Sequence, residues 1–98
     1  MAKYLFVYHG GGMAATEEER NESMAKWGAW AQQLGDHVID FGAPVGDSRT
    51  VGDANGASSA TGYSLIEASS LDEAAELAGG CPVLESGGSV EIGETLAM

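Results

Sequence analysis

Four short stretches of apolar residues alternate with two stretches in which apolar residues recur at helical spacing. The short stretches, residues 4–8, 37–41, 61–68 and 89–92, contain the β-branched and aromatic side chains that favour strands. Residues 4–8 are apolar at almost every position, which is typical of a strand buried on both faces of a sheet. The pattern therefore predicts four strands, the first of which lies inside the protein.

Two helices are predicted between these strands, and each begins with a capping box. Thr16 stands three positions before Glu19, and Ser70 stands three positions before Glu73. Glycines at positions 35, 79 and 80 predict that the helices end just before them. The apolar residues at helical spacing are Met24, Trp27, Trp30, Ala31 and Leu34 in the first helix, and Leu71, Ala74, Ala75 and Ala78 in the second.

The order of elements is βαββαβ, which predicts one α+β domain over residues 1–98 with a ferredoxin-like fold. Both helices pack on one face of a four-stranded antiparallel sheet in this fold. The other face would be bare in a monomer, although the first strand is apolar on both sides, so we expect a second copy of the chain to cover it. Residues 43–60 form a long loop rich in Gly, Ser and Asp, with a strand fragment expected at 49–51.

The charge of the chain excludes two classes of partner. Four basic residues stand against fifteen acidic ones, a formal net charge of −11, so the chain lacks the clustered cations that bind nucleic acid or anionic membranes. No apolar run approaches the roughly 20 residues that span a bilayer. With no signal-like segment and a single cysteine, Cys81, the expected location is the cytoplasm.

The most suggestive motif is a glycine-rich segment, residues 10–15, which matches the pattern G-x-G-x-x-A of dinucleotide-binding turns. The following helix, however, begins with three glutamates at 17–19, where a pyrophosphate would have to bind. The histidines, His9 and His37, are not spaced as metal ligands, and Cys81 is expected to be a small buried residue. We therefore expect no cofactor and no metal ion.

Four residues remain as a candidate site, because they follow the first two predicted strands. His9 ends the first strand, and Asp47, Ser48 and Arg49 follow the second. The guanidinium of Arg49 could hold a carboxylate through two parallel hydrogen bonds. The sequence thus suggests a small-carboxylate site, while a surface Arg49 paired with a nearby aspartate stays open as the simpler interpretation. Both tryptophans are expected in the core, although one of them could line a cavity.

The chain also resembles a known family, the YCII-related (DGPF-type) domain. The resemblance rests on residues 3–8, 27–35, 62–74, 81–82 and 87–92. It implies a dimeric α/β barrel of ferredoxin-like subunits, similar in fold to muconolactone isomerase, with a pocket between the sheet and the helices.

The same resemblance implies an acid/base pair in some members, which this chain does not share. Those members carry a histidine on the first helix and an aspartate just before the proline that follows the second. Here no histidine lies between residues 16 and 34, and Cys81 precedes Pro82. The family's histidine–aspartate chemistry is therefore not expected in this chain.

Two interpretations of function stay open. The first is a cytoplasmic homodimer that binds a small anionic ligand in a pocket without catalysis. The alternative is a small-molecule isomerase or lyase, in which His9 acts as acid or base and Arg49 anchors a substrate carboxylate.

Overall fold

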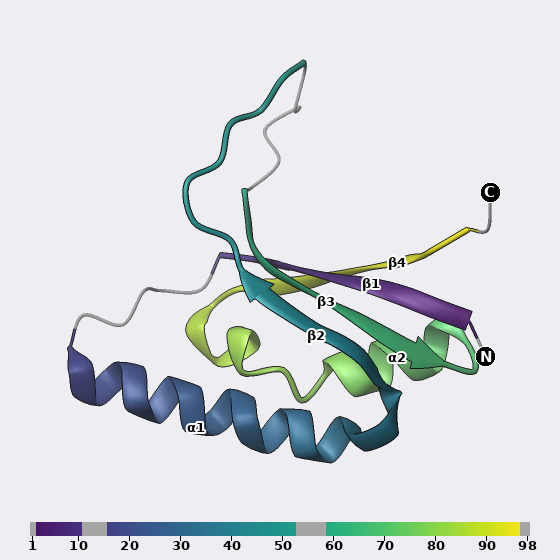
Figure 1. Ribbon diagram of the computed structural model, residues 1–98, viewed down its shortest axis with the longest axis horizontal. Helices are drawn as coiled ribbons and strands as arrows, with labels where there is room; N and C mark the ends of the chain where they lie inside the picture. Colours follow the sequence, from purple (N-terminus) through teal and green to yellow (C-terminus); the bar gives the residue numbers. More distant parts are fainter. Residues whose placement is uncertain (1, 11–15, 53–58, 97–98) are drawn as a thin grey trace.

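A computed structural model describes residues 2–10, 16–52 and 59–96 and has a four-stranded antiparallel sheet with two α-helices on one side (Figure 1). The strand order is β2-β3-β1-β4, so the two central strands are β3 and β1. This arrangement confirms the predicted ferredoxin-like α+β fold. The elements are β1 (Ala2–His9), α1 (Glu17–Leu34), the 3₁₀ turn η1 (Gly35–His37), β2 (Val38–Pro44), β3 (Ala60–Ala68), α2 (Leu71–Ala78), the 3₁₀ turn η2 (Pro82–Ser86) and β4 (Ser89–Glu94).

Both helices begin at the predicted caps. The hydroxyl of Thr16 accepts a hydrogen bond from the backbone N–H of Glu19 at 3.1 Å, and that of Ser70 accepts one from Glu73 at 3.1 Å. The Glu73 carboxylate in turn accepts the backbone N–H of Ser69 at 2.8 Å, one residue before the cap. This hydrogen bond lowers the pKa of Glu73. The start of each helix is thus fixed by its own local residues.

The core lies between the sheet and the helices. Because side chains alternate along a strand, Tyr4, Phe6 and Tyr8 of β1 point toward the helices, whereas Leu5 lies on the opposite, open face and is 39% exposed. The prediction that β1 is buried on both faces is therefore not met within a single chain. The buried hydrophobic residues are Tyr4, Phe6, Tyr8, Trp30, Leu34, Ile66, Ala68, Ala74, Ala78, Cys81 and Val83.

The helices differ from the prediction in which residues they bury. Met24 is 72% exposed, and Figure 1 shows the N-terminal end of α1 extending beyond the ends of the strands. In α2, Leu71 is 53% exposed, and Leu77 instead packs against the core. A helix of eight residues presents little more than one line of side chains to the sheet, and in α2 that line is Ala74, Leu77 and Ala78.

Strand β2 continues beyond the predicted end at Gly42. Its pairing with β3 shifts register between Val38 and Asp40 and again between Asp40 and Ala43. Gly42 has φ +78°, and a Cβ there would lie 1.8 Å from the backbone oxygen of Tyr63. Only glycine fits this irregularity, so the residue that was expected to end the strand instead allows it to bend and continue.

The long loop after β2 contains no strand in its described part. The strand fragment expected at 49–51 is wrong, since these residues belong to no regular element. Val51 is 94% exposed, so nothing in the described chain buries it. A β-branched residue alone does not make a strand when it has no surface to pack against.

Candidate cleft between helix α1 and the sheet

A cleft with a volume of about 1150 Å³ is bounded by α1, β2, the following loop and the start of β3. Small-molecule sites typically occupy about 300–1,000 Å³. Among the described residues that line the cleft, Asp47 is the one charged side chain. Further lining residues are Tyr8, Gly10, Ser23, Met24, Trp27, Gly28, Phe41, Gly42, Ala43, Pro44, Val45, Gly46, Ser59, Ala60, Thr61, Gly62, Tyr63, Val83 and Ser86.

Small residues leave the space that the cleft occupies. Nothing lies within 4 Å of the point where a Cβ would stand on Gly28 or Gly46. A Cβ on Gly62, by contrast, would approach the ring of Tyr8 to 3.1 Å. The pairing of Tyr8 with Gly62 across the two central strands therefore gives the Tyr8 ring room on the helix side of the sheet.

Aromatic rings form one wall of the cleft. The ring of Trp27 meets Tyr8 edge to face at a centroid distance of 4.9 Å, and it meets Phe41 in the same way at 6.3 Å. Trp30 lies behind Trp27 in the core, and its indole N–H donates to the backbone oxygen of Leu77 at 3.1 Å. Trp27 is half-buried, and its indole N–H makes no hydrogen bond to any residue that the structure describes. Trp27 is thus the tryptophan that lines a cavity.

Two buried hydroxyl groups next to this wall connect strands β1, β3 and β2. The Tyr8 hydroxyl donates to Oγ of Ser64 at 2.6 Å, and Ser64 donates to the backbone oxygen of Phe41 at 2.6 Å. Burial raises the pKa of Tyr8 to about 12, although its hydrogen bond with Ser64 acts in the opposite direction. Tyr8 is therefore a neutral phenol at ordinary pH and cannot serve as a base there.

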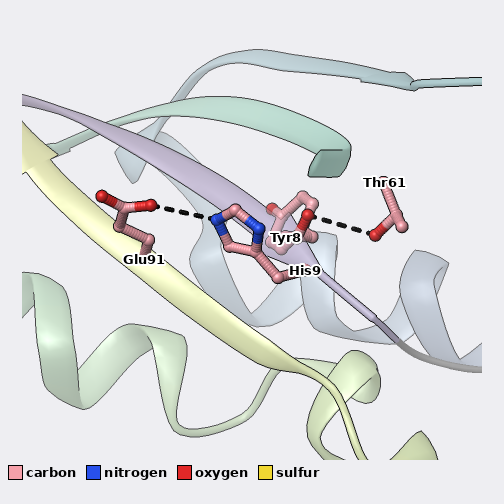
Figure 2. Close-up of polar contacts among 4 residues, drawn as sticks. All are labelled: Tyr8, His9, Thr61 and Glu91. Carbon is pink, nitrogen blue, oxygen red and sulfur yellow. Dashed lines mark hydrogen bonds and ion pairs between the residues drawn. The ribbon is translucent and has the colours of Figure 1, made fainter. Parts of the chain in front are cut away.

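His9 lies on the other face of the sheet. Its Nε2 is 3.0 Å from Oε1 of Glu91, as Figure 2 shows. Val7 pairs with Glu91 across β1 and β4, and His9 follows two residues after Val7, so all three side chains share the open face. In Figure 2, Thr61 donates to the backbone oxygen of Tyr8 at 3.1 Å. Strand alternation thus separates His9 from the cleft that Tyr8 lines.

Of the other predicted site residues, only Asp47 lines the cleft. Ser48 and Arg49 are exposed in the segment that follows, and Arg49 makes no ion pair with any residue in the described parts of the chain. A pairing of Arg49 with an aspartate is thus not seen within the described residues, and the nearby Asp53 lies outside them. The structure does not gather His9, Asp47 and Arg49 in one cavity, and a carboxylate site that includes them stays a prediction.

The remaining candidate groups carry no site in the described residues. Cys81 is 2% exposed, as expected, and burial raises its pKa to about 11. Within residues 2–10, 16–52 and 59–96, no three His, Cys, Asp or Glu side chains are placed to hold a metal ion. No helix there is long and apolar enough to cross a membrane. Most of the dinucleotide-like motif, residues 11–15, lies outside the described residues.

The residues that sequence reasoning missed are Tyr8, Ser64 and Phe41. One signal for them was present, because Ser64 is a polar residue between Gly62 and Ile66 on the inward-facing side of a predicted strand. A buried polar side chain needs a partner, but the sequence does not say which one.

A two-layer fold with a cleft between α1 and the sheet defines a ferredoxin-like α+β domain with room for a small molecule. The chain belongs to the YCII-related domain family, which matches residues 3–96. The resemblance in the sequence is thereby confirmed. No curated protein matches the chain.

One similar solved structure is 5-chloro-2-hydroxyhydroquinone dehydrochlorinase from Burkholderia phenoliruptrix, in complex with 2,5-dihydroxybenzoquinone. The two chains are 18% identical, with a TM-score of 0.57, and the match covers 94% of this chain and 93% of the other. At this level of identity the likeness shows a common fold.

Proposed function

We propose that the protein is a small-molecule-binding protein whose cleft holds the ring of a small aromatic carboxylate. The aromatic wall formed by Tyr8, Trp27 and Phe41 carries this proposal, because edge and face contacts with such rings favour a flat, apolar ligand. The structural neighbour binds a single six-membered ring, 2,5-dihydroxybenzoquinone, which supports a ligand of this size.

Arg49 would hold the carboxylate at the mouth of the cleft. It follows the cleft-lining Asp47 by two residues, it is exposed, and it has no ion-pair partner in the described parts of the chain. The acidic Asp47 and the net charge of −11 oppose an anion, so binding would depend on this cation. We expect the ligand to be bound without catalysis in the cleft.

The protein would act as a homodimer in the cytoplasm. Leu5, Ile39 and Tyr63 are 39%, 41% and 41% exposed, and the strand register places Leu5 and Tyr63 on the sheet face that carries no helix. A second copy of this face would bury these side chains and complete the α/β barrel expected of the family.

An isomerase or lyase is the second candidate, and the contact between His9 and Glu91 favours it. A carboxylate at 3.0 Å from an imidazole nitrogen can hold the ring in one orientation, as an acid or base requires. In this alternative the substrate binds over the open face beside His9, with Arg49 as its anchor.

Titration of ¹⁵N-labelled protein with benzoate and with neutral benzamide, followed by NMR, tests the proposal. We expect both ligands to shift the indole signal of Trp27. The change Arg49→Lys should weaken the binding of benzoate by about three- to tenfold, because lysine cannot form the paired hydrogen bonds. The affinity for benzamide should not change. Arg20→Lys, on the exposed face of α1, is the matched control.

Two outcomes separate the candidates. If neither ligand shifts any signal from the cleft at millimolar concentration, the proposed ligand class is wrong. If the ligands instead shift signals on the open face around His9, leave the cleft signals unmoved, and lose this effect in His9→Ala, the isomerase or lyase is favoured.

A further inference from the structure

The hydrogen bonds of Tyr8 have a direction that the surrounding chemistry fixes. A backbone oxygen can only accept, so Ser64 must donate its single proton to Phe41. Ser64 then has no proton for Tyr8, and the Tyr8 hydroxyl must donate to Ser64. The proton of Tyr8 is thus committed within the protein, and its oxygen has only lone pairs to offer.

We infer that the Tyr8 oxygen acts as a hydrogen-bond acceptor in the cleft and selects ligands that carry a donor there, such as a phenolic hydroxyl. This inference rests on the proposed function and names the ligand class within it. Tyr8 is 5% exposed and is one of the residues that line the cleft, and its hydroxyl makes no hydrogen bond in the described residues besides the one to Ser64. A donor on the ligand would satisfy the oxygen, whereas an ether or carboxylate oxygen would face its lone pairs.

Neighbouring groups support this selection. Thr61 also lines the cleft, but its hydroxyl directs its proton to the backbone oxygens of Tyr8 and Gly10, at 3.1 and 3.2 Å, and so cannot donate to a ligand in place of Tyr8. The high pKa of Tyr8 keeps its proton on the oxygen and in the bond to Ser64. The hydrogen-bonding pattern at the Tyr8 end is therefore constant across the ordinary pH range.

The selection also orients the ligand. A carboxylate next to the Tyr8 oxygen would meet lone pairs and lose its hydration, which is costly for a buried charge. The proposed anchor for the carboxylate, Arg49, lies in the exposed segment after Asp47. A hydroxybenzoate would thus enter with its hydroxyl toward Tyr8 and its carboxylate toward solvent.

Comparison of 4-hydroxybenzoate, 4-methylbenzoate and 4-methoxybenzoate near neutral pH tests the inference on the wild-type protein. The methyl group matches the hydroxyl in size, and the methoxy group keeps an oxygen but has no donor. We expect 4-hydroxybenzoate to bind about tenfold more tightly than either, a difference of about 1.4 kcal/mol. The readout is the dissociation constant from NMR shifts of cleft signals.

Two variants assign the preference to the predicted atoms. Tyr8→Phe keeps the ring and removes the acceptor, so the preference for the hydroxyl should disappear. Ser64→Ala frees the Tyr8 proton to donate to a ligand, so the affinity for 4-methoxybenzoate should rise relative to that for 4-hydroxybenzoate. Circular dichroism is used to check that each variant is folded. The comparison of the three ligands on the wild-type protein does not depend on either variant.

The outcomes separate this inference from the function on which it rests. If all three ligands bind in the cleft with equal affinity, the cleft binds aromatic carboxylates but the inference is overturned. If none binds, the proposed function fails and the inference fails with it.

Discussion

Tyr8 and Ser64 are buried hydroxyl residues on the helix side of the sheet, and they belong to one line of hydrogen bonds that runs from Tyr8 through Ser64 to Phe41. Ser64 is fully buried between Tyr8 and the backbone of Phe41, with both contacts at 2.6 Å. In the described residues no buried side-chain nitrogen or oxygen lacks a partner. This pairing lets polar groups lie in the core without the cost of an unsatisfied hydroxyl.

The raised pKa of Tyr8 predicts a loss of stability at alkaline pH. In the unfolded chain the phenol ionises near its ordinary pKa of 10.0, whereas in the folded chain burial keeps the proton until about pH 12. The stability contributed by neutral Tyr8 is therefore fully present below pH 10 and is lost as the pH rises to about 12. Urea unfolding between pH 8 and 12 should show a shallower decline for Tyr8→Phe than for the wild type.

Tyr63→Phe is the control for this measurement, because Tyr63 lies on the open face and is 41% exposed. It should leave the pH dependence close to that of the wild type. Burial raises the pKa of Cys81 to about 11, so this thiol also lowers the stability as the pH rises, in the wild type and in both variants. Equal slopes for the wild type and Tyr8→Phe would contradict the burial of this phenol.

At the scale of elements, the capped helix α2 positions part of the core beneath the sheet. Ala74 and Ala78 are buried, and Cys81 and Val83 follow directly in the chain. A helix of only eight residues forms poorly by itself, so its cap and its packing must act together. The cap at Ser70 is therefore expected to matter for the stability of the whole fold.

Ser70→Ala should lower the free energy of unfolding by about 1 kcal/mol, because the backbone N–H of Glu73 loses its partner. The matched control is Ser69→Ala, which keeps the backbone N–H that donates to Glu73. We expect the control to change stability by less than about 0.5 kcal/mol. If urea unfolding gives the same value for both variants, the hydroxyl of Ser70 does not cap the helix.

At the scale of the whole molecule, the sheet has one covered and one open face. The two helices lie on the same side of it in Figure 1, and the opposite face carries exposed Leu5 and Tyr63. Apolar side chains gathered on a flat surface favour contact between copies of the chain. The proposed homodimer follows from this asymmetry.

Light scattering should give a mass close to twice the 10.0 kDa of one chain at micromolar concentration. Tyr63→Glu should shift the mass toward the monomer, because it places an unpaired charge in the proposed interface. Val51→Glu is the matched control, since Val51 is 94% exposed in the loop after β2. A wild-type mass of 10.0 kDa across the whole concentration range would contradict the dimer.

The elements and their order could be predicted from the sequence, because the signals for them are local. Short runs of apolar, β-branched and aromatic residues predicted all four strands, and the hydroxyl–glutamate spacing at Thr16 and Ser70 predicted the first turn of each helix. These signals act over a few residues, within one strand or one turn. For the same reason the ferredoxin-like fold could be predicted from the order alone.

The extension of β2 and the location of the cleft depend instead on contacts between residues far apart in the chain. The bend at Gly42 depends on the Tyr63 backbone, and the hydrogen bonds of Tyr8 and Phe41 meet at Ser64, which lies 56 and 23 residues away from them in the chain. Strand alternation then placed His9 on the face opposite Tyr8, although the two are neighbours in sequence. Contacts between distant residues depend on how the strands pair, which no local pattern specifies.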